Sequence, residues 1–291
     1  MLSVMVLQET QMPLKSFWGK HMDLDPKTNG SLAGKPLHGR SVLVTGAAQG
    51  VGAAVARGCI DAGCTALFLV DRDLAGLQAR TREFINAGVA CEFTCGDLTD
   101  VDFVEGLVPL AVKSLGGLDA LANVAGLANR TPLLTSTVAD WDFLFAVNAR
   151  APFILMRDFT RHCMDENKGG SVMNISSMNA LRGTDVLTIY ASAKGALDTL
   201  TKNLAHGFGQ HQVRFNAIDA GWMDSPGERA MMKSLGHPPD FLDEMGRQQP
   251  FRRLIVPEDV ARLAVFLLGA DSYPMTGAII QHEQIVAGGR S

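Results

Sequence analysis

Short apolar runs alternate with amphipathic segments along the chain from about residue 40 onward. The run SVLVTG, at 41–46, is continuous and ends in glycine, which predicts a buried strand. GVGAAVARGCIDAG, at 50–63, then has helical spacing and a glycine stop. The alternation continues and predicts strands at 65–73, 90–97, 118–126, 170–177, 213–219 and 277–282, and helices at 74–86, 101–115, 138–148, 152–167, around 188–197 and at 257–269.

Alternating strands and helices predict an α/β fold with a parallel sheet covered by helices on both faces. Ligands of such sheets bind beyond the carboxyl ends of the strands, so functional residues should follow the strands directly. After Arg40 the chain has no linker or shift in composition, and we expect one domain over 40–291. Residues 1–39 lack periodicity, which predicts a flexible extension, with Met22 as an alternative start.

Charge and cysteine content narrow the possible partners and compartment. The chain has 26 Lys+Arg against 30 Asp+Glu and lacks a basic block, which argues against nucleic acid or an anionic membrane as partner. Apolar runs stay below the ~20 residues that a membrane span needs, and the amino terminus lacks the pattern of a secretory signal. The five cysteines predict buried, reduced thiols in a cytoplasmic protein. Cys91 and Cys95 share a strand face, but further metal ligands at suitable spacing are missing nearby.

A glycine-rich loop, TGAAQGVG at 45–52, lies between the first strand and the first helix. Glycines allow a pyrophosphate to approach the backbone, and the helix amino terminus favours its negative charge. Asp71 follows Gly52 by 19 positions (71 − 52), close to the ~20 expected for a carboxylate that binds a ribose 2′-hydroxyl. The carboxylate would repel a 2′-phosphate, and Gln49 adds no positive charge, so we expect NAD rather than NADP. Arg72 favours NADP instead, because its positive charge could turn toward a 2′-phosphate.

The motifs TGAAQGVG, NVAG, NISS and YASAK, together with Asn148, resemble those of the short-chain dehydrogenases/reductases in order and spacing, over roughly 40–281. The resemblance implies a Rossmann-type, doubly wound sheet of about seven strands in a three-layer sandwich. It also implies hydride transfer between a nicotinamide ring and a carbinol or carbonyl carbon, without a metal. Homologous enzymes are homotetramers or dimers, which implies helices around Asn148 and Tyr190 that pack against their copies.

Tyr190 and Lys194, at i and i+4, should share one helix face. A free phenol has a pKa of about 10, and we expect the Lys194 ammonium, aided by the positive nicotinamide ring, to lower it so that Tyr190 acts as general base or acid. By resemblance, Lys194 also holds the nicotinamide ribose, and Ser177, thirteen positions before Tyr190 (190 − 177), binds the substrate oxygen. Ser176 is expected to be structural. Asn148 resembles the asparagine that holds a water between Lys194 and solvent.

Further cofactor contacts are expected after each strand. Asp97 should bond the adenine edge or cap a helix, and Asn123 should brace the sheet beside the cofactor. The residues predicted to bind the cofactor are Gly46, Gln49, Gly50, Val51, Gly52, Asp71, Arg72, Asp97, Leu98, Asn123, Ala125, Gly126, Tyr190, Lys194, Gly221, Met223 and Ser225, and those predicted to bind the substrate are Ser177, Asn179, Tyr190 and Trp222.

Two stretches depart from the family pattern. Ala220-Gly221 replaces the usual Pro-Gly, with Ser225 where threonine is common, and Glu283-Gln284-Ile285 replaces Asp-Gly-Gly. Residues 222–250 are rich in methionine and interrupted by Pro and Gly, which predicts a mobile substrate lid or a small helical pair. Asn179, Arg182 and Asp185 should add polar groups near the reacting carbon, which favours a sugar or polyol over a steroid or acyl chain.

These observations predict an NAD-dependent dehydrogenase of a secondary alcohol or ketone. The alternative within enzymes is a carbonyl or 3-oxoacyl reductase that uses NADPH. A different class is a catalytically silent, nucleotide-sensing protein on the same scaffold. Such a protein would have no need for both Tyr190 and Lys194.

Overall fold

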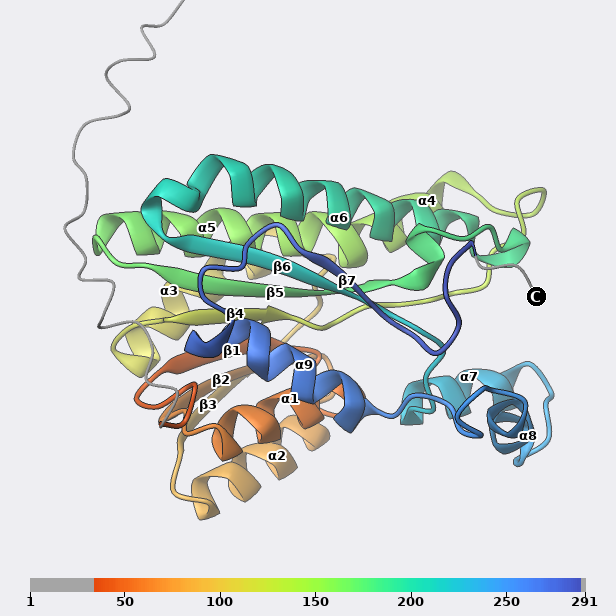
Figure 1. Cartoon of the computed structure of the whole chain (residues 1–291), viewed down its shortest axis with the longest axis horizontal. Helices are drawn as coiled ribbons and strands as arrows, with labels where there is room; N and C mark the ends of the chain where they lie inside the picture. The colour runs from red at the N-terminus through yellow and green to blue at the C-terminus, as the bar shows by residue number, and fades with distance from the viewer. Residues whose placement is uncertain (1–33, 289–291) are drawn as a thin grey trace, which may run out of the picture.

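The computed structural model describes residues 34–288, and within them seven strands form one parallel sheet (Figure 1). The strand order is β3-β2-β1-β4-β5-β6-β7. After β3 the chain therefore returns to the other side of β1, where β4 to β7 are added in sequence. The strands are β1 (Ser41–Thr45), β2 (Ala66–Asp71), β3 (Ala90–Cys95), β4 (Ala120–Asn123), β5 (Gly170–Ser177), β6 (Val213–Ala220) and β7 (Ile279–His282). The doubly wound, three-layer fold expected from the sequence is confirmed.

Helices cover both faces of this sheet and supply the outer layers (Figure 1). On one face α1 (Gly50–Asp61), α2 (Leu74–Asn86) and α9 (Pro257–Leu268) pack against the strands. On the other face lie α3 (Val101–Leu115), α5 (Ala151–Asp165) and α6 (Thr188–Phe208), with α4 (Val138–Phe145) leading into α5. The shorter α7 (Pro226–Ser234) and α8 (Phe241–Arg247) lie beyond the end of β6.

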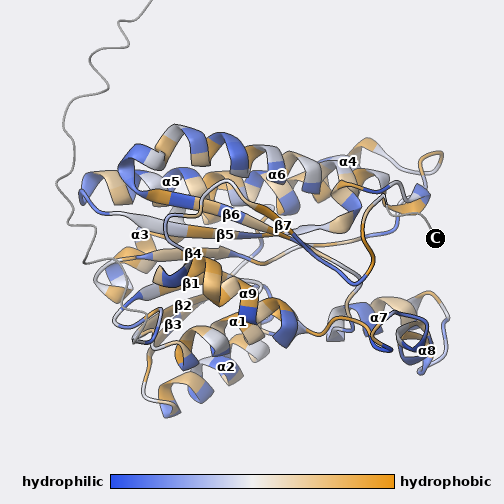
Figure 2. Cartoon of the chain, in the orientation of Figure 1, coloured by the Kyte–Doolittle hydropathy of each residue, from blue (hydrophilic) through white to orange (hydrophobic). Residues whose placement is uncertain are grey.

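The core explains why the strands are apolar without alternation. Val42 and Val44 of β1 point to the α1 side, whereas Leu43 points to the α3 and α5 side. Because both faces of each central strand are buried, both sets of side chains must be apolar. Figure 2 shows the helices as mixtures of hydrophobic and hydrophilic residues, as expected where one side packs and the other meets water.

The helices predicted at 138–148 and 152–167 are one continuous element in the structure. A five-residue π-helix, Ala146–Arg150, joins α4 to α5. Pro152 lies just beyond this turn and lacks the N–H of the regular helical ladder. It stands in the first turn of α5, immediately after the wider turn, where its missing donor is tolerated.

Packing onto the body begins before the boundary at residue 40 that the sequence suggested. Leu37 is fully buried, and its N–H donates to the Ala62 carbonyl over 3.0 Å. The Pro36 carbonyl accepts from the Ala270 N–H. Residues 36–39 therefore belong to the packed body, and residues 1–33 of the expected extension lie outside the described residues.

The cysteines lie within the described residues and are all free thiols. Cys59, Cys64, Cys91 and Cys163 are buried, as predicted. Cys95 was expected to be buried with Cys91 but is exposed, because it stands at the end of the edge strand β3. Within residues 34–288, no helix is long and apolar enough to cross a membrane, and no group of three or more His, Cys, Asp or Glu side chains is arranged to hold a metal ion.

Candidate active site

The glycine loop after β1 has a backbone conformation that favours glycine. Gly46 and Gly50 have φ values of +69° and +55°, in the left-handed region. A Cβ on Gly52 would lie 2.0 Å from the Gly46 carbonyl oxygen, so the loop closes tightly against the first turn of α1. The chain therefore exposes main-chain N–H groups at the start of α1, where an anion is favoured.

Asp71 ends β2 beside this loop. Its Oδ2 accepts from the Ala48 N–H and its Oδ1 from the Asp73 N–H, each over 3.0 Å. The carboxylate thus connects the glycine loop to the end of β2. Arg72 follows directly and lines the same cavity.

A cavity of about 260 Å³ lies over the carboxyl ends of β1, β2, β3 and β4. It is lined by most of the residues predicted to bind the cofactor, namely Gly46, Gln49, Gly50, Val51, Gly52, Asp71, Arg72, Asp97, Leu98, Ala125, Gly126 and Ser225. Asp97 does not cap α3, because Asp100 does so through the N–H groups of the first turn. The Asp97 carboxylate instead accepts from Thr99 N–H at the cavity wall.

These residues fit a nicotinamide dinucleotide. The tight glycine loop admits a pyrophosphate, and the carboxylate at the end of β2 stands where a ribose hydroxyl would be bound. Asn123 is the one predicted cofactor residue that lines neither this cavity nor the adjoining one that contains Tyr190 and Lys194. Its Nδ2 donates to Asn174 Oδ1 over 2.8 Å, so it braces β4 against β5.

A second cavity, of about 480 Å³, adjoins the first and shares Val51, Val124, Gly126 and Ser225 with it. It contains Ser177, Tyr190 and Lys194, together with Gly221 and Met223. Ser177 ends β5, and the other two side chains come from the first two turns of α6. The fold therefore brings the residues predicted for catalysis next to the predicted cofactor cavity.

Tyr190 and Lys194 share one face of α6, as their spacing predicts. The Lys194 Nζ lies 5.8 Å from the centroid of the tyrosine ring and donates to the Ile175 carbonyl over 2.7 Å. Lys194 is almost completely buried. Burial lowers its pKa to about 8, against the opposite influence of Asp198 and Asp219.

The expected lowering of the Tyr190 pKa is not what the structure shows. Burial raises the pKa of Tyr190, a hydrogen bond with Ser177 lowers it, and the charges of Glu228 and Asp219 raise it. The physical reason lies in the orientation of Lys194. Its ammonium points to a main-chain carbonyl, so burial and nearby carboxylates dominate the phenol's surroundings.

Ser177 and Asn179 form a small polar group opposite the tyrosine. Ser177 Oγ accepts from the Asn179 main-chain N–H over 3.1 Å and from its side-chain amide over 3.4 Å. Asn179 Oδ1 accepts from the Thr184 hydroxyl. With its acceptor capacity engaged from this side, the Ser177 hydroxyl has one proton left to donate, and the hydrogen bond with Tyr190 uses it.

Asn148 stands in the middle of the π-helix and is fully buried. Its Oδ1 accepts from Leu127 N–H, and its Nδ2 donates to the carbonyls of Leu127 and Leu144. Both Asn148 Oδ1 and Lys194 Nζ approach within 3.1 Å of the position that a Cβ on Gly126 would take. The side chain therefore holds the loop after β4 close to the lysine.

Charged side chains line the second cavity beyond the predicted set. Arg130 Nη2 donates to Glu228 Oε1 over 3.1 Å, and the Trp222 indole donates to the same oxygen over 2.9 Å. On the other side Arg182 approaches Glu283 at 3.8 Å. The Arg130–Glu228 pair links the body to the segment after β6, and the Arg182–Glu283 pair links it to the segment after β7.

Of these charged residues, Arg182 was expected near the reacting carbon and does line the cavity, and Glu283 carried a signal as part of the departure from the family's Asp-Gly-Gly. A Cβ on Gly221 would lie 2.4 Å from the Glu283 carboxyl, so the glycine makes room for that side chain. Asp185, expected near the reacting carbon, is exposed and does not line the cavity. It starts a short 3₁₀ turn instead, where its carboxylate accepts from Val186 N–H.

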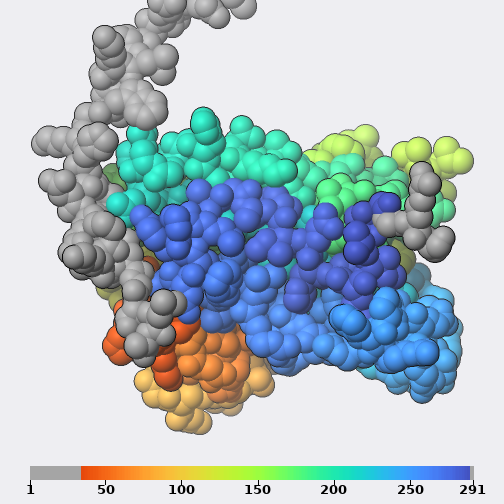
Figure 3. Space-filling model, in the orientation of Figure 1, coloured from red at the N-terminus to blue at the C-terminus, as the bar shows by residue number. Residues whose placement is uncertain are grey.

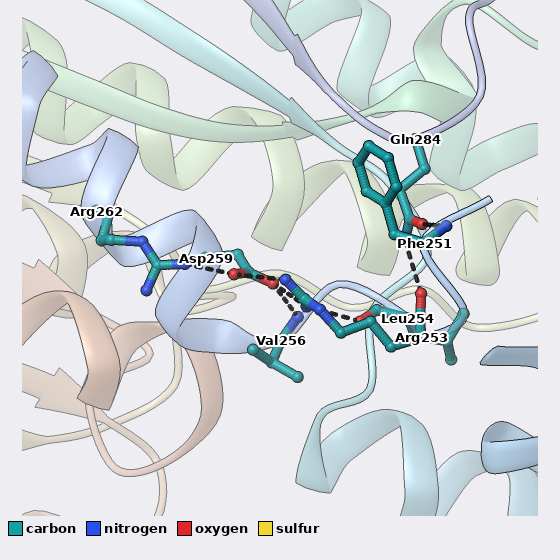
Figure 4. Close-up of polar contacts among 7 residues, drawn as sticks. All are labelled: Phe251, Arg253, Leu254, Val256, Asp259, Arg262 and Gln284. Carbon is teal, nitrogen blue, oxygen red and sulfur yellow. Dashed lines mark hydrogen bonds and ion pairs between the residues drawn. The ribbon is translucent and has the colours of Figure 1, made fainter. Parts of the chain in front are cut away.

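Residues 222–250 form the helical pair α7 and α8, with a small core of Met232 and Leu242 closed by Leu254. Figure 3 shows this segment in light blue beside the C-terminal residues. Figure 4 shows the return to α9, where Gln284 bonds Phe251 and Arg253. The helical pair is thus tied to the segment that carries Glu283.

Comparison with known proteins agrees with this geometry. Residues 46–284 match a family model described as enoyl-(acyl carrier protein) reductase. The chain is 30% identical to the 5-keto-D-gluconate 5-reductase of Escherichia coli strain K12, over 84% of this chain and 94% of that protein. It is 33% identical to the L-xylulose reductase of Bos taurus, over 84% and 95%.

Solved structures show the same architecture. The 3-oxoacyl (acyl-carrier-protein) reductase of Agrobacterium tumefaciens C58, with NADP bound, superposes with a TM-score of 0.78 at 26% identity, over 89% of this chain and 97% of that one. Sequence match, fold and site geometry agree. The chain belongs to the short-chain dehydrogenase/reductase family and is an oxidoreductase that acts on alcohol or carbonyl groups with a nicotinamide cofactor.

Proposed function

We propose that the protein oxidises a secondary alcohol with NAD, and catalyses the reverse reduction, through Ser177, Tyr190 and Lys194. The observation that carries this proposal is the meeting of these three side chains in one cavity that adjoins the glycine-loop cavity. When bound, the nicotinamide ring accepts the hydride from the carbinol carbon or returns it.

Tyr190 moves the proton in this scheme. In oxidation its oxygen takes the hydroxyl proton of the alcohol as the carbon–hydrogen bond breaks, and in reduction it gives that proton to the carbonyl oxygen. Ser177 positions the substrate oxygen by donating its hydroxyl proton. Because the pKa of the buried Lys194 falls to about 8, its ammonium can exchange a proton near neutral pH and relay it from Tyr190.

Asn148 completes the proposed path. Its side chain is engaged with Leu127 and Leu144, so a water beside Lys194 would be held by the main chain of the π-helix rather than by the side-chain amide. The same side chain keeps Gly126 against Lys194. Asn148 therefore shapes the proton exit.

Tyr190→Phe tests the central assignment. It should lower kcat about 100-fold or more, the usual range for loss of a general acid or base, and leave NADH affinity within about twofold. The second tyrosine of the chain is the matched control, because Tyr273 is 43% exposed and lines neither cavity. Tyr273→Phe should keep full turnover. If Tyr190→Phe also kept it, Tyr190 would not be the proton-transferring group.

The substrate cavity favours a small polyhydroxylated molecule such as a sugar, sugar acid or polyol. Its lining includes Asn179, two arginines and two glutamates, which offer hydrogen-bond partners for hydroxyl or carboxylate groups. The relatives named for 5-keto-D-gluconate and L-xylulose act on molecules of this kind. A spectrophotometric screen of NADH formation across sugars, sugar acids, polyols, steroids and hydroxyacyl thioesters tests this choice.

A 3-oxoacyl reductase that uses NADPH is the second candidate. The similarity to the NADP-bound Agrobacterium reductase favours it, as does the position of Arg72 at the cofactor cavity. The same screen separates the two candidates. Oxidation of NADPH by an acyl thioester, with no response to polyols, would replace the first proposal by the second.

The helical pair at 222–250 is, in this proposal, the substrate lid. It contributes Trp222 and Glu228 to the cavity and is attached to the body through Arg130. Free cysteines and a nicotinamide cofactor support a reducing compartment, and we propose the cytoplasm.

A further inference from the structure

Two buried carboxyl groups meet behind the proposed active site. Asp198 lies one helical turn beyond Lys194 on α6, and Asp219 lies near the end of β6. Asp219 is fully buried and Asp198 is 8% exposed, and the two carboxyls are within hydrogen-bonding range of each other. Neither oxygen of Asp219, nor Oδ1 of Asp198, has another hydrogen-bond partner in the part of the chain that the structure describes.

The surroundings cannot satisfy two ionised carboxylates. The Ser176 hydroxyl lies beside both carboxyls and also donates to the Lys194 carbonyl over 3.4 Å. A hydroxyl has a single proton to donate, and three acceptors compete for it. Two buried like charges without enough donors are strongly unfavourable, so one carboxyl must keep its proton and donate to the other.

We propose that Asp198 and Asp219 share one proton and act as positioning residues that set the protonation of Lys194 and Tyr190. The first half of this proposal stands on the buried pair alone. The second half rests on the proposed catalytic roles of Lys194 and Tyr190.

The charged side chains around the pair show which catalytic group its charge can influence. Lys194 and Lys202 face it from α6, and both lower the pKa of Asp198. The neighbours of Asp219 in the adjacent strands are neutral. Ser176 lies opposite it on β5, and Gln281 lies opposite it on β7. Lys194 is the buried one of the two lysines, so its charge is least screened by water.

The pKa directions agree with this geometry. Burial raises the pKa of Asp198, and burial together with the Asp198 carboxyl raises that of Asp219 to about 7. In return, both carboxyls raise the pKa of Lys194 against the larger effect of burial, and Asp219 raises that of Tyr190. Loss of the shared proton therefore adds a negative charge that favours the ammonium and disfavours the phenolate.

The sharing of a proton is tested by the pH dependence of stability. A carboxyl whose pKa is raised in the folded state stabilises the protein fully when the pH is below the pKa that the carboxyl has in the unfolded chain, about 4. This stabilisation is lost as the pH rises through the folded-state pKa. The Tm of the wild-type protein should therefore fall by several degrees between about pH 5 and pH 9. Asp219→Asn replaces the shared proton by an amide donor, so its Tm should fall less over the same range.

Asp119→Asn is the matched control, because Asp119 is half-buried at the opposite end of the sheet and is bonded to Ser41 and Lys168. Its pKa is lowered, so this substitution should reduce Tm by a similar amount at every pH in the range. If Asp219→Asn and Asp198→Asn both kept the wild-type slope of Tm against pH, the proposal of a shared proton would be overturned.

The link to the site is tested by the pH profile of turnover. Asp219→Asn should move the midpoint of alcohol oxidation about one unit toward lower pH, because Tyr190 and Lys194 lose a negative neighbour. Asp119→Asn should leave the midpoint unchanged. A flattened Tm slope with an unmoved profile would overturn the positioning role alone. Failure of the proposed catalytic function would show separately, as full turnover in Tyr190→Phe.

Discussion

Asp71 is the carboxylate that, in our proposal, determines the choice of cofactor. It already accepts two main-chain hydrogen bonds that fix it beside the glycine loop. A ribose 2′-hydroxyl can donate to it, whereas a 2′-phosphate would meet a like charge. Arg72, next to it, carries the opposite charge and lines the same cavity, so we expect substitutions at these two positions to change the preference between NAD and NADP.

Asp71→Ser should raise the KM for NAD roughly tenfold and lower that for NADP, equivalent to about 1.4 kcal/mol for each tenfold change. Steady-state kinetics with both cofactors measure this. Arg72→Ala is the companion variant, and we expect it to leave the KM for NAD within about twofold and to raise that for NADP. An equal change in both constants after Asp71→Ser would contradict the assignment.

The sequence predicts which residues lie in the site where they belong to a motif. It does not predict those that only the fold brings together. The spacing of Ser177, Tyr190 and Lys194 placed them in one cavity, as the structure shows. Asp198 and Asp219 are separated by 21 positions (219 − 198) and meet only because α6 packs on β6. Their pairing, and its effect on the Tyr190 pKa, is a property of burial that no local pattern records.

At the level of elements, strand and helix order was predictable, because alternation and glycine stops mark each segment. The π-helix was not, since Ala146–Arg150 has ordinary helix-forming residues and only Pro152 disturbs the pattern. The wider turn places Asn148 against Leu127, a contact across 21 residues (148 − 127). Tertiary packing, rather than local propensity, selects it.

The return from the helical pair to α9 is fixed by one carboxylate (Figure 4). Asp259 accepts from the Val256 N–H over 3.0 Å, closing the first turn of α9, and pairs with Arg253 and Arg262. The pairing with Arg253 and the backbone hydrogen bond outweigh burial and lower the pKa of Asp259 to about 2. The stability that it contributes is therefore present above about pH 4 and is lost as pH falls through about 2.

Asp259→Ala should lower the free energy of unfolding by about 1–2 kcal/mol, the usual effect of losing a helix cap, because the ion pairs are largely exposed. For a domain of this size the Tm should fall by roughly 3–6 °C, as measured by calorimetry at neutral pH. Asp271→Ala removes the same charge from an exposed position and should change Tm by less than about 1 °C. Equal losses in the two variants would mean that the network at Asp259 adds nothing beyond charge.

At the scale of the whole molecule, the helices around Asn148 carry exposed aromatic side chains. Trp141 and Phe153 are 44% and 40% exposed, and Trp141 stacks on Phe145 with ring centroids 4.3 Å apart. Phe145 and Phe153, together with Leu200 of α6, border a shallow cavity. Exposed aromatic groups of this kind are typical of interfaces between protein chains.

We predict that this surface joins copies of the chain into a dimer or tetramer. Phe153→Glu would place a charge in the buried centre of that contact, so light scattering should show the mass of the particle falling by half or more at micromolar concentration. Ile85→Glu is the control, because Ile85 is 53% exposed on α2, on the opposite face of the sheet, and should leave the mass unchanged. A monomeric wild type, or an oligomer that tolerates Phe153→Glu, would contradict the prediction. Since Asn148 and Tyr190 lie on the helices that carry or adjoin this surface, loss of the oligomer should also lower kcat, which ties the assembly to the proposed proton path.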